Sequence, residues 1–143
     1  MSQENVDLVR GLWEPFKGVD LTTVDWDHEA IREISERFWS PDVELRWARS
    51  GPEARVYKGR DGVIQAFREW AEPFREYYIE ALDFIGEGDC VLIPQRHSGI
   101  GSTSGVSVEQ EFTHVYEVRD HMITRVDEYD TLKEALEAAG LSE

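Results

Sequence analysis

Residues 106–129 read VSVEQEFTHVYEVRDHMITRVDEY, and this stretch indicates the fold class of the chain. Polar and apolar side chains alternate along 106–118 and again along 122–129, which is the periodicity of β-strands. The short polar segment between them, 119–121, predicts a tight hairpin turn. Two long antiparallel strands therefore lie side by side close to the C-terminal end of the sequence.

The same alternation appears twice upstream, whereas the first half of the chain has the three- and four-residue spacing of amphipathic helices. Val6, Val9 and Leu12 show this spacing in the first helix, and Asp27 is expected to cap the second. Helices first and hairpin strands later predict an α+β fold, with a curved antiparallel sheet packed on three helices. The expected elements are helix 3–17, helix 27–39, strand 42–47, strand 55–58, a helix that opens at 59–62 and ends at Pro73, strands 78–85, 90–98, 106–118 and 122–129, and helix 131–139.

The composition predicts one soluble domain that spans residues 1–143. The chain has 30 acidic and 15 basic side chains, for a net charge of -15. Because a phosphate backbone needs compensating Lys and Arg, nucleic acid and anionic membranes are poor partners. No apolar run reaches the ~18 residues of a membrane span, and the first five residues lack the features of a signal peptide, which favours a cytoplasmic location. The one cysteine, Cys90, lies in an apolar strand and is expected to be buried.

Four stretches, in this order and spacing, resemble the SnoaL-like branch of the nuclear transport factor 2-like superfamily. They are SQENVDLVRGLWEPF at 2–16, SPDVEL at 40–45, VYKGRDGVIQAF at 56–67 and THVYEVRDHMITRVDEYD at 113–130. Two features depart from the family pattern. Residues 22–30 look like an insertion between the first two helices, and His121 stands in a turn where the family usually has glycine.

The resemblance implies a cone-shaped α+β barrel, in which a curved sheet wraps around the helices and leaves an apolar cavity. It also implies a homodimer, commonly formed through the outer face of the sheet. Members of the superfamily include polyketide cyclases, steroid isomerases, epoxide hydrolases and dehydratases, and others bind ligands or proteins without catalysis. The fold alone therefore does not give the function.

The steroid isomerases of this superfamily are the first comparison for a catalytic site. Their tyrosine and two aspartates align with Leu12, Arg46 and Thr113, so their mechanism is not expected here. In SnoaL-like cyclases and limonene-epoxide hydrolases an aspartate near the end of the last strand serves as acid or base. Glu128 is the matching position and Asp127 the second, and strand alternation puts the two on opposite faces. A carboxyl group in an apolar cone can move a proton α to a carbonyl, whereas two solvent-facing carboxylates are the alternative.

The strand 90–98 offers a second group of polar side chains. If Gln95 and His97 face the cavity, His97 is expected to assist proton transfer as an auxiliary residue. If the alternate side chains of this strand face the cavity instead, Arg96 is the pocket residue. Arg46 or Arg96 is expected to steady an oxyanion or a substrate carboxylate, and His114 is interpreted as structural. The other residues expected to contact the substrate are Trp13, Phe16, Phe38, Trp47, Phe67, Trp70, Thr113 and Val115.

Cofactors and metals are not expected. The glycine-rich segment 99–105 leads into a strand rather than a helix, so it is a hairpin connection and not a phosphate loop. The histidines are far apart in the sequence and no cysteine cluster accompanies them. We therefore expect a domain that binds a small apolar molecule and carries out cofactor-free acid–base chemistry. The alternative is a non-catalytic ligand-binding or protein-interaction module of the same fold.

Overall fold

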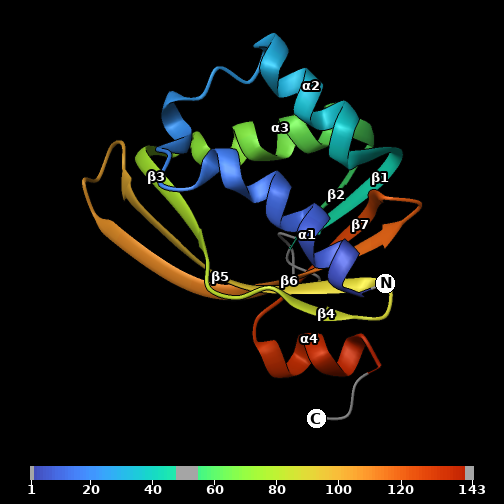
Figure 1. Ribbon diagram of the computed structural model, residues 1–143. Coiled ribbons are helices and arrows are strands. Elements are labelled where there is room, and N and C mark those ends of the chain that lie inside the picture. Colours follow the sequence, from blue (N-terminus) through green and yellow to red (C-terminus); the bar gives the residue numbers. More distant parts are fainter. Residues whose placement is uncertain (1, 48–54, 141–143) are drawn as a thin grey trace.

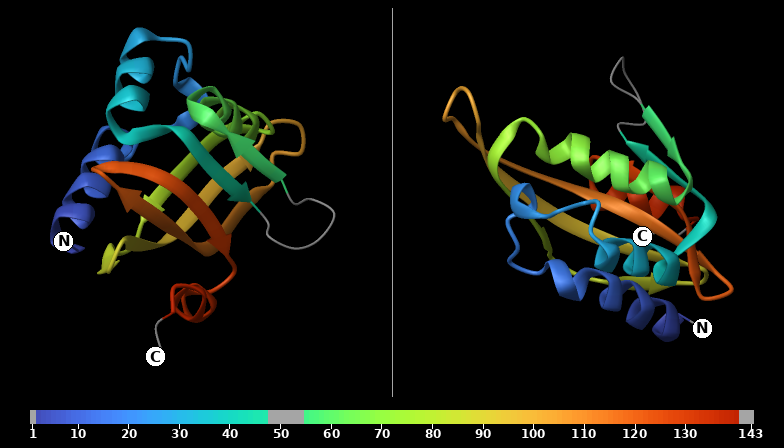
Figure 2. Two further views of the ribbon diagram at one scale, coloured as in Figure 1. Left: turned by 90° about the vertical axis from the view of Figure 1, so that its right-hand side faces the viewer. Right: turned by 90° about the horizontal axis from the view of Figure 1, so that it is seen from above.

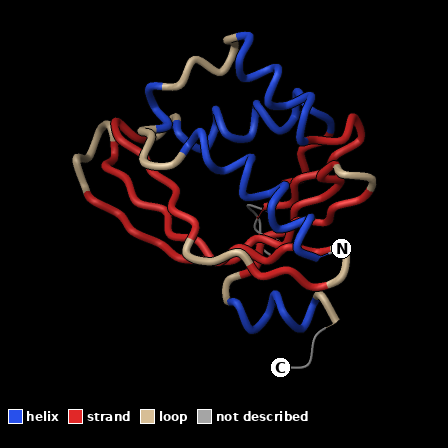
Figure 3. Tube along the Cα trace, viewed as in Figure 1, coloured by secondary structure: helices blue, strands red, loops and turns tan. Residues whose placement is uncertain are grey.

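A computed structural model describes the backbone of residues 2–47 and 55–140, and the side chains of 3–46 and 55–140. Helices and strands follow the predicted order (Figures 1 and 3). The elements are α1 Ser2–Trp13, η1 Glu14–Phe16, η2 Leu21–Thr23, α2 Glu29–Phe38, β1 Trp39–Trp47, β2 Arg55–Lys58, α3 Gly59–Ala71, β3 Phe74–Ala81, β4 Ile85–Glu87, β5 Cys90–Gly101, β6 Ser107–Arg119, β7 Met122–Tyr129 and α4 Leu132–Ala138.

Seven strands form one curved, open sheet in the order β2-β1-β7-β6-β5-β3, with β4 paired to β5. The prediction of an α+β fold with a curved sheet is confirmed. One pair departs from the predicted antiparallel arrangement, because β1 runs parallel to β7. Hairpin connections fix the directions of β5, β6 and β7 relative to one another. No short turn joins β1 to β7, so local sequence does not reveal their relative direction.

The three N-terminal helices cover the concave face of this sheet (Figures 1 and 2). Val9 of α1, Phe38 at the end of α2 and Val63 of α3 are buried in one core with Leu45 and Ile93 of the sheet. Each of these apolar side chains contributes on the order of 1.5–3 kcal/mol when removed from water. Among the described residues, no helix has the length and apolar character needed to cross a bilayer.

Helix α4 lies on the other, convex face of the sheet (Figure 1). Its Ala135 is fully buried against Leu92 of β5 and Val115 of β6. Thr131 caps this helix, since its side chain accepts a hydrogen bond from the Glu134 amide at 3.1 Å. The terminal helix therefore covers part of the convex face with its own small core.

Both ends of α2 differ from the prediction. His28 caps α2 instead of Asp27, because its Nδ1 accepts the Ala30 amide hydrogen at 3.0 Å. Strand β1 already begins at Trp39, two residues before Pro41. The β1–β7 register shifts between Trp39 and Glu44, and an irregularity of this kind tolerates a proline that donates no hydrogen bond.

The hairpin predicted at 119–121 joins β6 to β7. Asp120 and His121 both have positive φ, at 53° and 65°. Two consecutive left-handed residues match the right-handed twist of the flanking strands, which is why asparagine and glycine are favoured at such positions. Aspartate is also favoured at the first of these positions, where Asp120 stands, whereas the Cβ atom of His121 disfavours the left-handed conformation at the second.

Asp20 fastens the segment between α1 and α2 to the sheet. Its Oδ1 accepts hydrogen bonds from the Thr22 amide at 3.0 Å, the Thr22 hydroxyl at 2.7 Å and the Tyr77 amide of β3 at 3.1 Å. Partial burial raises the pKa of Asp20, but the three hydrogen bonds outweigh it and the pKa is lowered. The segment is therefore held by an ionised carboxylate.

Candidate functional site

An apolar cavity of about 80 Å³ lies between the three helices and the concave face of the sheet. Interdigitated aromatic and branched side chains form nearly all of its wall. Only His114 and Tyr116 carry titratable groups among the described residues that line it. The lining residues are Leu12, Trp13, Phe16, Leu21, Trp26, Ile31, Ile34, Ser35, Trp39, Val63, Ile64, Phe67, Ile79, Gln95, His114 and Tyr116.

Three stacked aromatic rings form one part of the cavity wall. The rings of Phe16 and Trp26 lie 6.3 Å apart at an interplanar angle of 19°, and those of Trp26 and Phe67 lie 5.9 Å apart at 14°. Trp26 comes from the segment 22–30, which the sequence marks as an insertion. The insertion therefore supplies the central ring of this wall.

His114 and Glu128 form a polar pair at the sheet side of the cavity. The two residues are directly opposed in the β6–β7 register, and Nε2 of His114 lies 3.3 Å from Oε2 of Glu128. The His114 side chain is 2% exposed and lines the cavity, whereas the Glu128 side chain is 15% exposed. A carboxylate in this position orients the imidazole and stabilises it when it carries a second proton.

His97 lies on the same concave face but belongs to a closed hydrogen-bond network. Gln95 Nε2 donates to the Ile93 carbonyl at 3.3 Å, so its Oε1 accepts from Nε2–H of His97 at 2.7 Å. Nδ1 of His97 then accepts from the Tyr77 hydroxyl. Burial, and next the nearby His114, lower the pKa of His97 to about 2. His97 is therefore a neutral, hydrogen-bonded residue, and it does not line the cavity.

Two buried tyrosines accompany these histidines. Burial raises the pKa of Tyr77, and the charge of Glu128 raises it further. Burial also raises the pKa of Tyr116, although a hydrogen bond with Trp13 lowers it in part. Because an indole N–H only donates, the Tyr116 oxygen accepts this bond. Both phenols are therefore neutral at physiological pH.

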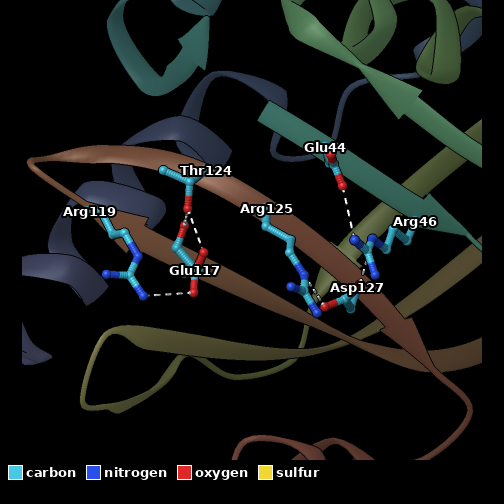
Figure 4. Close-up of polar contacts among 7 residues, drawn as sticks. All are labelled: Glu44, Arg46, Glu117, Arg119, Thr124, Arg125 and Asp127. Atoms are coloured by element: carbon cyan, nitrogen blue, oxygen red, sulfur yellow. Dashed lines mark hydrogen bonds and ion pairs between the residues drawn. The ribbon is translucent and has the colours of Figure 1, made fainter. Parts of the chain in front are cut away.

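Asp127 faces away from the cavity, on the convex side of the sheet (Figure 4). Its Oδ2 accepts a hydrogen bond from Arg125 Nε at 2.8 Å, and its Oδ1 lies 3.8 Å from Arg46 Nε. Arg46 also pairs with Glu44 at 3.0 Å. Asp127 and Arg46, predicted to act on a substrate, thus belong to a row of ion pairs across β1 and β7.

Arg96 also lies outside the cavity. Its guanidinium pairs with Glu80 at 3.3 Å, with Glu111 at 3.0 Å and with Glu109 at 3.7 Å. The side chains of Gln95 and His97 face the concave side instead, so the structure supports the first of the two strand parities considered above. The hydrogen bonds and charges of Glu111, then Glu80 and Glu109, raise the pKa of Arg96 against partial burial.

The structure places the other expected contact residues in three environments. Trp13, Phe16 and Phe67 line the cavity. Phe38 is buried in the core, and Trp70 packs against the His97 ring at 4.6 Å, but neither lines the cavity. Thr113 and Val115 are buried on the strand face opposite His114 and Tyr116, and the side chain of Trp47 lies outside the described residues.

Several cavity residues were missed in the sequence. Ile31, Ile34 and Ser35 project from α2, and their three- and four-residue spacing marks one helix face. That pattern identifies the buried face of a helix, but it does not distinguish residues that line a cavity from residues that pack in the core. The position of Trp26 depends on the loop that carries it, which has no periodic signal. Among the described residues, no three His, Cys, Asp or Glu side chains gather in an arrangement suited to a metal.

The curved open sheet, with three helices on its concave face, defines an NTF2-like α+β fold. Residues 21–126 match the SnoaL-like domain family, and the chain belongs to that family. No curated protein sequence matches the chain.

Solved structures share this fold at low sequence identity. An NTF2-like protein from Burkholderia xenovorans has 18% identity and a TM-score of 0.65 over 90% of each chain. A protein assigned as a SnoaL-like polyketide cyclase from a Jannaschia species has 15% identity and a TM-score of 0.70, over 99% of this chain and 95% of that chain. A protein with a ketosteroid isomerase-like fold from Catenulispora acidiphila, solved in complex with trimethylamine, has 16% identity and a TM-score of 0.60 over 82% and 87%.

Proposed function

We propose that this protein binds a small, largely apolar carbonyl compound in its cavity and catalyses proton transfer α to the carbonyl. The observation that carries the proposal is the His114–Glu128 pair, in which a cavity-lining imidazole contacts a half-buried carboxylate. The family supports it, since a SnoaL-like neighbour is assigned as a polyketide cyclase. Apolar walls favour the body of such a molecule, and an imidazole that contacts a carboxylate can act as a general base.

The reaction needs one base and no net change in the protein. The α-carbon of the ketone loses a proton to the His114–Glu128 pair. The electron pair of the broken C–H bond forms a C=C bond, and the π pair of the carbonyl moves onto oxygen to give an enolate. Return of a proton to the α-carbon regenerates the ketone, and with a β,γ-unsaturated ketone return to the γ-carbon gives the conjugated isomer. Glu128 stabilises the imidazolium that forms between the two steps. In this proposal His114 takes up the proton, a role that the sequence assigned to Glu128, and Glu128 stabilises the imidazolium. His114 also replaces His97 as the histidine of the site.

Deuterium exchange tests the proposal without knowledge of the natural substrate. Acetophenone is incubated with the protein in buffered D₂O, and loss of its methyl proton signal is followed by NMR. We expect the wild-type protein to accelerate exchange, and His114→Gln and Glu128→Gln to reduce this acceleration at least tenfold. His121→Gln is the matched control, because His121 is exposed in the β6–β7 turn. Equal rates for wild type and His114→Gln would contradict the catalytic proposal.

Ligand binding without turnover is the second candidate function. One observation favours it: no carboxylate is among the described residues that line the cavity. Binding of acetophenone with no exchange above the buffer rate would support this alternative.

The homodimer and the cytoplasmic location expected from the sequence are further proposals. Light scattering during size exclusion tests the homodimer, and a monomer at all concentrations would contradict it.

A further inference from the structure

Ser35 is a buried hydroxyl with no hydrogen-bond partner among the described residues. It lies in the last turns of α2, its side chain is 4% exposed, and it lines the apolar cavity. A hydroxyl buried without a partner loses its bonds to water and destabilises the fold by about 1–3 kcal/mol. A group that enters the cavity and bonds to Ser35 would recover this loss.

Ser35 also lines a second hollow, a polar groove of about 430 Å³ between α2 and α3. Trp26, Ser35 and Ile64 belong to both hollows, so the groove adjoins the cavity at these three residues. The α2 side of the groove is lined by the cap residue His28 and by Arg32, Ser35 and Glu36 of the helix, which recur at three- and four-residue steps and share one helix face. Ser35 therefore lies where the apolar cavity meets a polar, solvent-connected surface.

The charges of the groove are balanced. Arg68 pairs with Asp27 at 2.8 Å. Arg60 donates from Nε to the Trp39 carbonyl at 2.9 Å and from Nη2 to the Glu36 carbonyl at 3.3 Å. The groove thus offers no excess positive charge, and the whole chain has a net charge of -15. Three of the charged lining residues are basic, Arg32, Arg60 and Arg68, and three are acidic, Asp27, Glu36 and Asp61.

From these observations we propose that Ser35 binds the uncharged oxygen of the cavity's ligand, with the apolar body of the ligand in the cavity and any further polar substituent in the groove. The ligand class is an amphipathic ketone or alcohol, not a carboxylate. This inference rests on the proposed function and adds the residue that selects the substrate. It also gives an orientation, since a carbonyl held at Ser35 on the helix side turns the rest of the molecule toward His114 on the sheet side.

Tyr116 is the other hydroxyl on the cavity wall, and it differs from Ser35 in being bonded. Its oxygen accepts from Trp13, so it gains less from a ligand than an unpartnered hydroxyl does. A site built to bond an oxygen rejects an isostere that lacks it, because the buried polar group stays unpaired. The preference for oxygen is therefore expected to depend on Ser35.

Three probes of nearly equal shape test the inference: acetophenone, α-methylstyrene, in which CH₂ replaces the oxygen, and benzoate. Dissociation constants come from NMR titration of the tryptophan indole N–H signals. We expect wild type to bind acetophenone about tenfold more tightly than α-methylstyrene, equivalent to about 1.4 kcal/mol, and benzoate more weakly than acetophenone. Ser35→Ala should bind the two neutral probes equally, whereas the exposed-site control Ser107→Ala should keep the preference.

A stability measurement separates this role from a merely structural one. Ser35→Ala removes an unsatisfied hydroxyl, so its melting temperature without ligand should equal or exceed that of wild type while its ketone preference is lost. A Ser35→Ala protein that still prefers acetophenone tenfold would overturn the inference and leave the proposed function standing. Tightest binding of benzoate would also overturn it. Failure of all three probes to bind would overturn both the inference and the proposed function.

Discussion

His114 and Glu128 are directly opposed on β6 and β7, with Nε2 and Oε2 3.3 Å apart. The imidazole is buried at the cavity wall, and the carboxylate behind it retains a 15% exposed side chain. The pair therefore joins the apolar cavity to a carboxylate that remains in contact with solvent.

Glu128→Gln should separate binding from turnover. The amide keeps the size of the side chain and its contact with the imidazole but cannot stabilise an imidazolium by charge. We expect the acetophenone dissociation constant to stay within about threefold of wild type while the deuterium exchange rate falls at least tenfold. Parallel loss of affinity and exchange would assign Glu128 a structural role instead.

His97 should make the fold acid-sensitive. Its pKa is about 2 in the folded protein and about 6.5 when unfolded, so below pH 6.5 the unfolded chain binds the additional proton. Stability is therefore lost as the pH falls, by about 1.4 kcal/mol per pH unit. Between pH 7.5 and 4.5 wild type should lose about 3 kcal/mol relative to His97→Gln, as measured by urea denaturation. A constant difference between the two proteins over this range would refute the assignment.

Asp20 should contribute stability with the opposite pH dependence. Its folded pKa is lowered, so its stabilising effect is present above the unfolded value of about 3.9 and disappears as the pH falls through the folded pKa. At pH 7 Asp20→Ala should destabilise by about 1–2 kcal/mol through loss of the bonds to Thr22 and Tyr77. At neutral pH Asp20→Asn should be less stable than wild type. The gap should close below pH 4, and a gap independent of pH would contradict this role.

The β6–β7 turn should be open to stabilisation. His121 has a φ of 65°, a conformation that glycine adopts without a Cβ penalty. We expect His121→Gly to raise the free energy of unfolding by about 1 kcal/mol. His121→Ala is the control, because it removes the imidazole but keeps the Cβ atom, and it should give no such gain. Equal effects of the two substitutions would point to the imidazole rather than to the backbone.

The fold could be predicted from the sequence wherever local pattern determines structure. The hairpin at 119–121 and the amphipathic helices were confirmed because turn chemistry and side-chain periodicity act over a few residues. The parallel pairing of β1 with β7 was missed because it joins residues about 80 positions apart, such as Leu45 and Val126. The exact start of α2 was missed because aspartate is a common N-cap residue and histidine is not, whereas the His28 side chain is the one that accepts the Ala30 amide hydrogen.

The candidate site was harder to predict than the fold. Glu128 was identified through a family resemblance, and alternation correctly separated it from Asp127. His97 and His114 share the concave face, and only the network through Gln95 and Tyr77 shows which of them is fully bonded. Distances of this kind depend on how β3, β5 and β6 are brought together, which no local pattern contains.

The most direct measurement is an NMR titration of the indole N–H signals with acetophenone, in wild type and in Ile34→Phe, where a larger ring fills the cavity. Trp13, Trp26 and Trp39 line the cavity, whereas Trp70 does not. If the cavity is the binding site, the first three signals move most and saturate in wild type, and Ile34→Phe abolishes the change. Unchanged signals up to the solubility limit, or an equal response in Ile34→Phe, would contradict binding in the cavity.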